Sequence, residues 1–159
     1  IPAGYLRKNF GFRFLPDFDR KLWNDVKTRA DQGITAMPSG LVAGSDVAQN
    51  AVKASRVNSN KLPHGDQISI TRSDFRDLKG LENKVILCNP PYGIRLGDSE
   101  LQQFYRSLGD FLKQRCKGSQ AFIYFGNREM LKHMGLKPSW KKPLRNAGLD
   151  GRLAKYEMY

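Results

Sequence analysis

The sequence has few cysteines, few acidic residues and no long apolar run. Its 159 residues include two cysteines, Cys88 and Cys116, whose spacing is not typical of metal ligands. A disulfide scaffold is therefore unlikely to define the fold, no metal site is expected, and a reducing cytoplasm is the favoured compartment. No apolar run approaches the roughly 18 residues of a membrane span, and no signal-peptide pattern is present. Because the chain begins at Ile rather than Met, we expect it to be part of a longer protein.

Acidic residues are outnumbered almost two to one. Lys and Arg total 27 against 15 Asp and Glu, which gives a net charge of +12 and a sequence pI near 9.9. Such an excess favours a polyanionic partner, usually nucleic acid, although many ordinary bacterial proteins are also basic. A membrane surface is disfavoured as partner, because no amphipathic segment combines a basic face with an aromatic one.

Strand and helix patterns alternate along the chain. Apolar spacing predicts helices over 17–33, with Asp17 as cap and Gly33 as stop, over 47–58 and 98–116, and a short one from Asn127. Strands are predicted over 40–46, from 67 to about 71, over 84–88 and 120–126, and as a final pair around an Asn-Ala-Gly turn. This order predicts an α/β fold, with a largely parallel sheet that ends in an antiparallel pair.

Polar residues follow the predicted strands, where ligands of open α/β sheets bind. Asp46 is placed to accept hydrogen bonds from both hydroxyls of a ribose; alternatively, it caps the next helix. Asp74 could accept from an adenine amino group, with Phe75 packing on the ring, or it is simply an acid in a turn.

The stretch NPPYG, residues 89–93, follows an apolar strand and is hard to explain by stability alone. The two prolines hold Asn89 and Pro90 extended and stiffen the loop. The Asn89 side-chain oxygen and the Pro90 carbonyl could then accept both hydrogens of one exocyclic amine, while Tyr92 offers a flat face to its ring. Accepting both hydrogens stabilises positive charge that develops on the nitrogen, so the loop suits attack by an aromatic amine on an electrophile.

NPPYG after a strand resembles the fourth motif of the class I S-adenosylmethionine-dependent amino-methyltransferases, which modify adenine N6, guanine N2 or a glutamine amide. The resemblance extends over five further segments: IPAGYLRKNFGFRF, DFDRKLWNDV, GSDVAQNAVKASRVN, YRSLGDFLKQRCKGSQAFIYFGN and LKPSWKKPLRNAGLDGRLAKYEMY. Together they resemble the catalytic domain of the THUMP-associated bacterial 23S ribosomal RNA guanine-N2 methyltransferases.

This resemblance implies a Rossmann-like fold and S-adenosylmethionine as the methyl donor. It implies donor contacts at the residues after the strands, namely Asp46, Val47, Asp74, Phe75 and Asn89. It also implies that Asn89, Pro90, Pro91 and Tyr92 carry the catalysis, with Tyr92 and Gly93 at the target base.

One family element has no counterpart in the sequence. The family holds the methionine part of the donor with a loop of the form Asp-Pro-x-Cys-Gly-Ser-Gly-Thr, and nothing like it occurs here. We therefore expect residues 1–159 to be the carboxyl-terminal part of the catalytic domain, with this loop and a THUMP domain upstream. The sheet would then be incomplete on its amino-terminal side, leaving a hydrophobic edge.

Basic residues cluster near the carboxyl end. PSWKKPLRNAG combines an aromatic residue with Lys141, Lys142 and Arg145, which suits phosphate contacts beside base stacking, although it could be a merely solvated hairpin. Arg95, in the loop after the motif, is a further candidate for phosphate, or an ordinary surface arginine. A paired base would have to be flipped out to reach such a pocket.

The leading hypothesis is methylation of guanine N2 in large-subunit ribosomal RNA. Adenine-N6 methylation of DNA stays open, because both targets are aromatic amines and the motif does not separate them. Methylation of a protein glutamine is disfavoured by the charge of +12. A non-catalytic RNA-binding piece is the alternative from another class. The target nucleotide and the oligomeric state are left open by the sequence.

Overall fold

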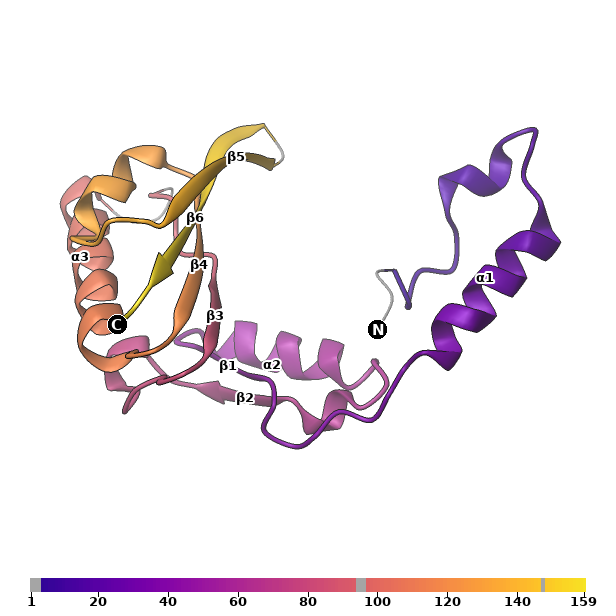
Figure 1. Cartoon of the computed structure of the whole chain (residues 1–159), viewed down its shortest axis with the longest axis horizontal. Helices are drawn as coiled ribbons and strands as arrows, with labels where there is room; N and C mark the ends of the chain where they lie inside the picture. The colour runs from indigo at the N-terminus through magenta and orange to yellow at the C-terminus, as the bar shows by residue number, and fades with distance from the viewer. Residues whose placement is uncertain (1–3, 94–96, 147) are drawn as a thin grey trace. The chain divides into compact units, whose positions relative to one another are not determined.

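The structure is a computed structural model that describes residues 4–93, 97–146 and 148–159 (Figure 1). The chain divides into two compact units, Ile1–Asp74 and Phe75–Tyr159.

The first unit combines two helices with a two-stranded sheet. Its elements are η1 (Gly11–Phe14), α1 (Arg20–Gln32), β1 (Ala43–Asp46), α2 (Gln49–Ser59), η2 (Gly65–Gln67) and β2 (Ser69–Arg72). β1 and β2 run parallel, and Asp46 pairs with Arg72 at the end of the ladder. The Arg56 guanidinium of α2 donates to the Ile70 carbonyl of β2, and it thereby ties the helix to the sheet.

Helix α1 starts later than the sequence predicted. Its cap is Asp19 rather than Asp17, because the Asp19 side chain accepts hydrogen bonds from the backbone N–H groups of Lys21 and Leu22. The predicted stop at Gly33 is confirmed. An aromatic cluster lies beside the helix, where the Phe10 and Phe12 rings contact Trp23 at centroid distances of 5.3 and 4.9 Å.

The second unit carries a mixed sheet. Its elements are η3 (Phe75–Asp77), β3 (Val85–Cys88), α3 (Asp98–Arg115), β4 (Gln120–Phe125), η4 (Arg128–His133), β5 (Trp140–Asn146) and β6 (Leu149–Glu157). The strand order is β3-β4-β6-β5, in which β3–β4 is parallel while β4–β6 and β6–β5 are antiparallel. In Figure 1, α3 and η4 lie on the same side of this sheet.

Helix α3 supplies much of the core of this unit. Leu101, Tyr105, Leu108, Phe111 and Leu112 are buried, and Phe104 packs against them from a partly buried position, as the apolar spacing predicted. The hydroxyl of buried Ser119, just before β4, accepts from the Lys84 N–H at 2.8 Å and donates to the Leu81 carbonyl. This side chain therefore satisfies two backbone groups of the segment that leads into β3.

The expected α/β class, with parallel strands followed by a final antiparallel pair, is confirmed. Among the described residues the strands form two sheets, and the four ladders are divided equally between parallel and antiparallel. Within the part of the chain that the structure describes, β1 and β2 form one sheet, and β3 is the edge strand of the other, paired with β4. The edge strand β3 exposes Val85 and Leu87 at 70% and 80%.

Candidate active site

The NPPYG loop leaves the carboxyl end of β3 and is anchored by one buried proline. Pro90 is buried, whereas Asn89 and Pro91 are exposed and Tyr92 is half-buried. Gly93 adopts φ +98°, where a side chain would be strained, and a Cβ there would lie 3.0 Å from the Leu101 side chain. The glycine of the motif is thus required by the backbone that ends the loop.

The loop contains its own hydrogen bond. The Tyr92 hydroxyl donates to the Asn89 side-chain oxygen, the atom that the sequence analysis assigned to the target amine. An amide oxygen has two lone pairs, so this bond leaves one acceptor position and fixes the direction of the Asn89 side chain. Tyr92 therefore orients the amide as well as offering a ring.

The Tyr92 ring lies against Tyr124 of β4 and against Gly126, the residue that follows this strand. Its edge meets Tyr124 of β4 at a centroid distance of 5.7 Å and an interplanar angle of 82°. A Cβ on Gly126 would lie 2.6 Å from two carbons of the Tyr92 ring, and one on Gly151 of β6 would lie 2.3 Å from the Tyr124 hydroxyl oxygen. Glycine at these two positions lets both rings lie directly on the backbone. We call Tyr124, Gly126 and Gly151 the Tyr92 seat.

The opposite end of the loop is held by α3. The buried Tyr105 hydroxyl donates to the Pro91 carbonyl at 3.2 Å, and its ring stacks on Phe125 at 5.3 Å. Burial raises the pKa of Tyr105 well above its ordinary value, so this hydroxyl remains a hydrogen-bond donor throughout the physiological range. Neither Tyr105 nor the Tyr92 seat was identified from the sequence, where only the glycine after the QAFIYF strand hinted at a close approach.

A shallow cavity opens beside Asn89. It has a volume of ≈ 340 Å³ and is lined by Leu87, Cys88, Asn89, Phe122 and Leu153. Its walls are mainly apolar, and Asn89 supplies the amide. Burial raises the pKa of the Cys88 thiol to about 11, so the thiol stays protonated and is not a nucleophile near neutral pH.

The donor-side candidates Asp46, Val47 and Asp74 belong to the first unit. One oxygen of the exposed Asp46 carboxylate accepts from the Ala48 N–H at 2.7 Å. The N-cap of α2 is Ala48, without a side-chain capping bond, so the alternative that Asp46 caps this helix is wrong. The other oxygen is available to a ligand hydroxyl. Val47 is 56% exposed, and Asp74 is the last residue of this unit.

Phe75 opens the second unit and packs against its core. The ring meets Phe104 and Phe111 edge-on at 5.5 and 5.6 Å, with the Arg76 guanidinium 5.8 Å from its centroid. The structure therefore places Asn89, Pro90, Pro91, Tyr92 and Gly93 together in one loop. It places Asp74 and Phe75 on either side of the division between the units.

The predicted RNA contacts in the carboxyl-terminal hairpin are exposed, but the strand register separates them. Lys141 and Arg145 of β5 lie opposite Ala154 and Asp150 of β6, while Lys142 lies opposite Leu153. Alternate residues of a strand point to opposite faces, so Lys142 shares its face with Trp140, whose ring centroid lies 5.1 Å from its Nζ. Arg95 lies outside the described residues.

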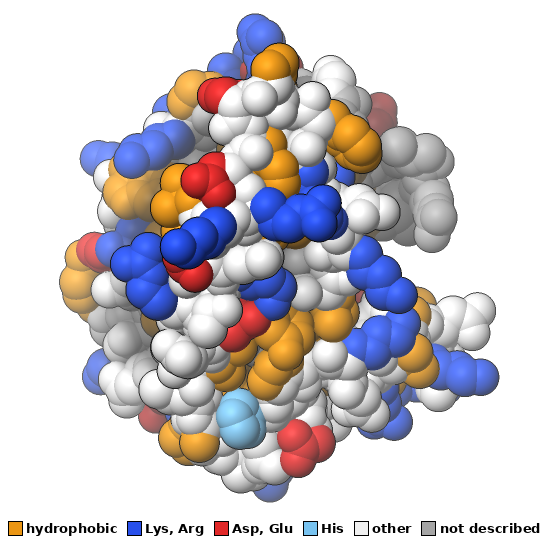
Figure 2. All heavy atoms as spheres, turned by 90° about the vertical axis from the view of Figure 1, so that its right-hand side faces the viewer, with side chains coloured by type: hydrophobic (Ala, Val, Ile, Leu, Met, Phe, Trp, Pro, Cys, Tyr) orange, Lys and Arg blue, Asp and Glu red, His pale blue; other side chains and the backbone are white. Residues whose placement is uncertain are grey.

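Positive charge is not confined to the hairpin. Figure 2 shows Lys and Arg side chains across one face of the molecule, with Asp and Glu side chains scattered among them. Within the described ranges, no group of three or more His, Cys, Asp or Glu is arranged to hold a metal ion. No helix in the same ranges has the length and apolarity to cross a membrane.

The fold defines the class of protein. SMU.472, named as a methyltransferase and solved with SAH, aligns with a TM-score of 0.81 at 24% identity over 96% of this chain and 41% of that one. A protein of Clostridium difficile 630 named as a methylase aligns with a TM-score of 0.81 at 25% identity, again over 96% and 41%. The chain therefore has the α/β methyltransferase fold.

Sequence comparison then gives the family. Residues 1–155 match the UPF0020 family, described as "RMKL-like, methyltransferase domain", and the chain belongs to this family. The slr0064 protein of Synechocystis sp., named as an RNA methyltransferase, is 36% identical over all of this chain and 42% of its own length. The ribosomal RNA large subunit methyltransferase K/L of Photobacterium profundum is 31% identical over 98% of this chain and 23% of its own. The chain thus spans less than half the length of these relatives. The resemblance drawn from NPPYG is confirmed for family and fold.

Proposed function

We propose that this domain transfers a methyl group from S-adenosylmethionine to an exocyclic amino group of an RNA base. The observation that carries the proposal is the exposed Asn89 amide, oriented by Tyr92, at the end of a strand in a methyltransferase fold. The names of slr0064 and of the K/L methyltransferase support RNA as the substrate. The net charge of +12 agrees with a polyanionic partner.

The residues on the donor side are chemically suited to S-adenosylmethionine. Asp46 keeps one carboxylate oxygen for a ribose hydroxyl, and Val47 offers apolar surface next to it. Asp74 with Phe75 would take the adenine, whose amino group is a donor and whose ring is flat. The donor supplies an electrophilic methyl group when bound. The relative SMU.472 was solved with the demethylated product, SAH.

The amine side follows from the loop. An exocyclic amine donates two hydrogens, and the free acceptor position of Asn89 together with the Pro90 carbonyl would accept them. Accepting both hydrogens draws the nitrogen lone pair out of the ring and stabilises the positive charge that grows as the N–C bond forms. The S–C bond of the donor would break as the N–C bond forms, with its electron pair remaining on sulfur so that SAH leaves. One of the two amine hydrogens would then pass to solvent water as a proton, and the amine would keep the methyl group.

Within RNA we propose guanine N2 of large-subunit ribosomal RNA as the target and the cytoplasm as the compartment. The name of the Photobacterium profundum relative supports ribosomal RNA, and the family resemblance of the flanking segments supports guanine N2. Arg95, Lys141, Lys142 and Arg145 are the proposed RNA contacts outside the pocket.

The test is direct chemical identification of the product. The full-length protein and, in parallel, residues 1–159, which we expect to be less active without the upstream donor loop, are incubated with methyl-labelled S-adenosylmethionine and unmodified ribosomal RNA, and the digested nucleosides are separated. We expect label in N2-methylguanosine and at least a hundredfold loss of rate in Asn89→Ala, in the range seen when one transition-state donor or acceptor is removed. Asn58→Ala, at an exposed site in α2, is the matched control and should retain the rate. A parallel incubation contains unmethylated DNA in place of RNA. Label in DNA adenine and none in RNA would overturn the substrate, and no label with either nucleic acid would favour a binding module.

A further inference from the structure

The face of the β5–β6 hairpin opposite Trp140 carries a cluster of arginines. The strand register places Arg145 directly across from Asp150, with Arg152 two residues farther along β6 on the same face. Arg128, at the start of η4, reaches the same carboxylate from outside the hairpin. We call Arg128, Arg145 and Arg152 with Asp150 the arginine cluster.

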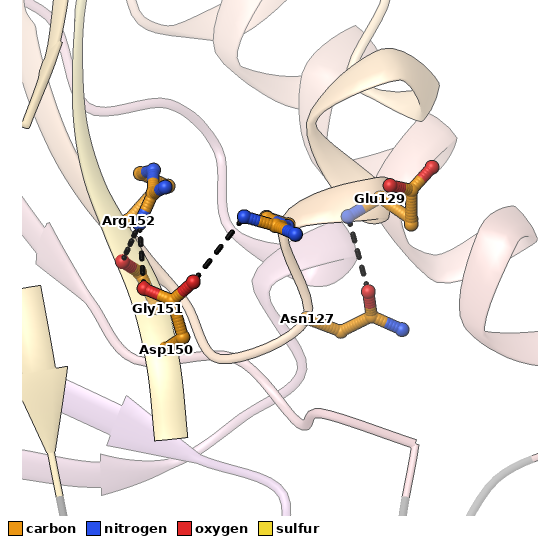
Figure 3. Close-up of polar contacts among 6 residues, drawn as sticks. Asn127, Glu129, Asp150, Gly151 and Arg152 are labelled. Carbon is orange, nitrogen blue, oxygen red and sulfur yellow. Dashed lines mark hydrogen bonds and ion pairs between the residues drawn. The ribbon is translucent and has the colours of Figure 1, made fainter. Parts of the chain in front are cut away.

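One carboxylate organises this cluster. Asp150 accepts from Arg152 Nη1 at 2.9 Å with one oxygen and from Arg128 Nη1 at 3.2 Å with the other, so that it lies between the two guanidinium groups (Figure 3). Arg152 also donates to the Gly151 carbonyl at 2.9 Å and is the least exposed of the three, at 24% against 57% for Arg128 and 55% for Asp150. Its guanidinium is therefore the most firmly positioned.

The cluster keeps a surplus of positive charge. The hydrogen bond from Arg152, followed by the charges of Arg152, Arg128 and Arg145, lowers the pKa of Asp150, so the carboxylate is ionised near neutral pH. Three guanidinium groups then surround one negative charge. Each guanidinium has five N–H donors, and Asp150 engages only Nη1 of Arg128 and of Arg152. The remaining donors form the planar fork that suits a phosphate group.

The cluster is also joined to the NPPYG loop. Gly151, between Asp150 and Arg152, lies against the Tyr124 ring. The Tyr124 ring in turn makes an edge-to-face contact with the Tyr92 ring. One aromatic ring therefore separates the backbone of the arginine cluster from the ring beside the proposed target base. The register places Tyr124 on the face of Leu153 and Lys142, so the cluster and the Tyr92 ring lie on opposite faces of the same sheet, and an anion held by the cluster would lie on the same unit as the motif.

We propose that Arg128, Arg145 and Arg152 form a binding site for a backbone phosphate of the RNA substrate, with Asp150 holding the arginines in place. This rests on the proposed function and adds Arg128 and Arg152 to the RNA contacts proposed above. Phosphate contacts fix the register of a nucleic acid without reading its sequence. The site would hold the strand so that one nucleotide is presented to Asn89, and Lys142, on the other face of the hairpin, would take no part in it.

The experiment measures RNA affinity as a function of salt. A labelled single-stranded fragment of ribosomal RNA is titrated with the protein and with Arg128→Gln, Arg152→Gln and the double variant. We expect the slope of log affinity against log salt to become shallower by about 0.7 for each arginine removed, and by about 1.4 for both. Lys113→Gln, which removes one charge from an exposed position of α3, is the matched control and should leave the slope unchanged. Arg152 is the less exposed arginine, so circular dichroism checks that Arg152→Gln is folded. Arg128 is more exposed, and Arg128→Gln therefore tests the same site with less risk of unfolding.

The outcomes separate this site from the proposed function. If Arg128→Gln and a folded Arg152→Gln bind RNA with the same salt slope as the unsubstituted protein, the phosphate site is overturned. The proposal of RNA methylation is unaffected by this outcome. No RNA binding by the unsubstituted protein would count against the RNA substrate itself. Inorganic phosphate, titrated by calorimetry, forms a second arm. If the protein binds inorganic phosphate, Arg152→Gln abolishes that binding, and the salt slope of RNA affinity is unchanged in Arg152→Gln, the site binds free phosphate and the proposed RNA contact is overturned.

Discussion

The close approach of Gly126 to the Tyr92 ring predicts that one added methyl group will disturb the proposed target-base site. In Gly126→Ala the new Cβ would lie 2.6 Å from Cγ and Cδ1 of Tyr92, whereas ordinary contacts begin at 3.4 Å. The ring must therefore move by nearly an ångström, away from the edge of Tyr124 and from its bond to Asn89. Overpacking of this kind costs about 1–3 kcal/mol of unfolding free energy.

The assay is a double-mutant cycle in urea. The chain has two tryptophans, one in each unit, so Trp23→Phe leaves Trp140 as a fluorescent reporter of the second unit. We expect Gly126→Ala to cost about 1–3 kcal/mol with Tyr92 present, and close to nothing in a Tyr92→Ala background, where the ring is absent. Gly11→Ala, where no atom lies within 4 Å of the added Cβ, is the matched glycine control.

The catalytic readout uses the same variants. If displacement of Tyr92 misdirects the Asn89 amide, Gly126→Ala should lower the methyl-transfer rate while Gly11→Ala does not. An equal cost of Gly126→Ala in the presence and absence of the Tyr92 ring would refute the reasoning, because the strain would then arise elsewhere.

Three other perturbations follow from single contacts. Ser119→Ala removes a buried hydroxyl that serves two backbone groups and should lower the unfolding free energy by about 1–3 kcal/mol, with exposed Ser99→Ala unchanged, in urea titrations. Tyr105→Phe leaves the Pro91 carbonyl without its donor and should cost about 1 kcal/mol and reduce the methyl-transfer rate; an unchanged rate would show that this bond does not hold the loop. Burial raises the pKa of Cys88 to about 11, so the unfolded chain loses this proton first, and stability should fall as pH rises from about 8.5 toward 11. Thermal unfolding across that range tests the sign, and Cys88→Ser should flatten the part of the curve that comes from this thiol.

The sequence by itself determined the elements and the motif of this protein. The apolar stripe of α3 follows from the spacing of apolar residues within one helix, and the stiffness of the NPPYG loop follows from its two consecutive prolines. Both features depend on neighbouring residues and can therefore be predicted from the sequence. The resemblance carried by that motif was sufficient to predict the family. The cap of α1 shows the limit, since Asp17 and Asp19 are both acceptable residues and only backbone geometry selects Asp19.

Tertiary structure alone decided how the motif is supported. Tyr124, Gly126 and Gly151 are distant from Tyr92 along the chain. Tyr124 and Gly126 contact its ring, and Gly151 contacts Tyr124, because β3, β4 and β6 belong to one sheet. The pairing of β5 with β6 likewise brought Arg145 opposite Asp150 and put Lys142 on the other face. Local periodicity tells which residues share a face of one strand, whereas contacts between strands depend on register, which is fixed only when the whole sheet packs.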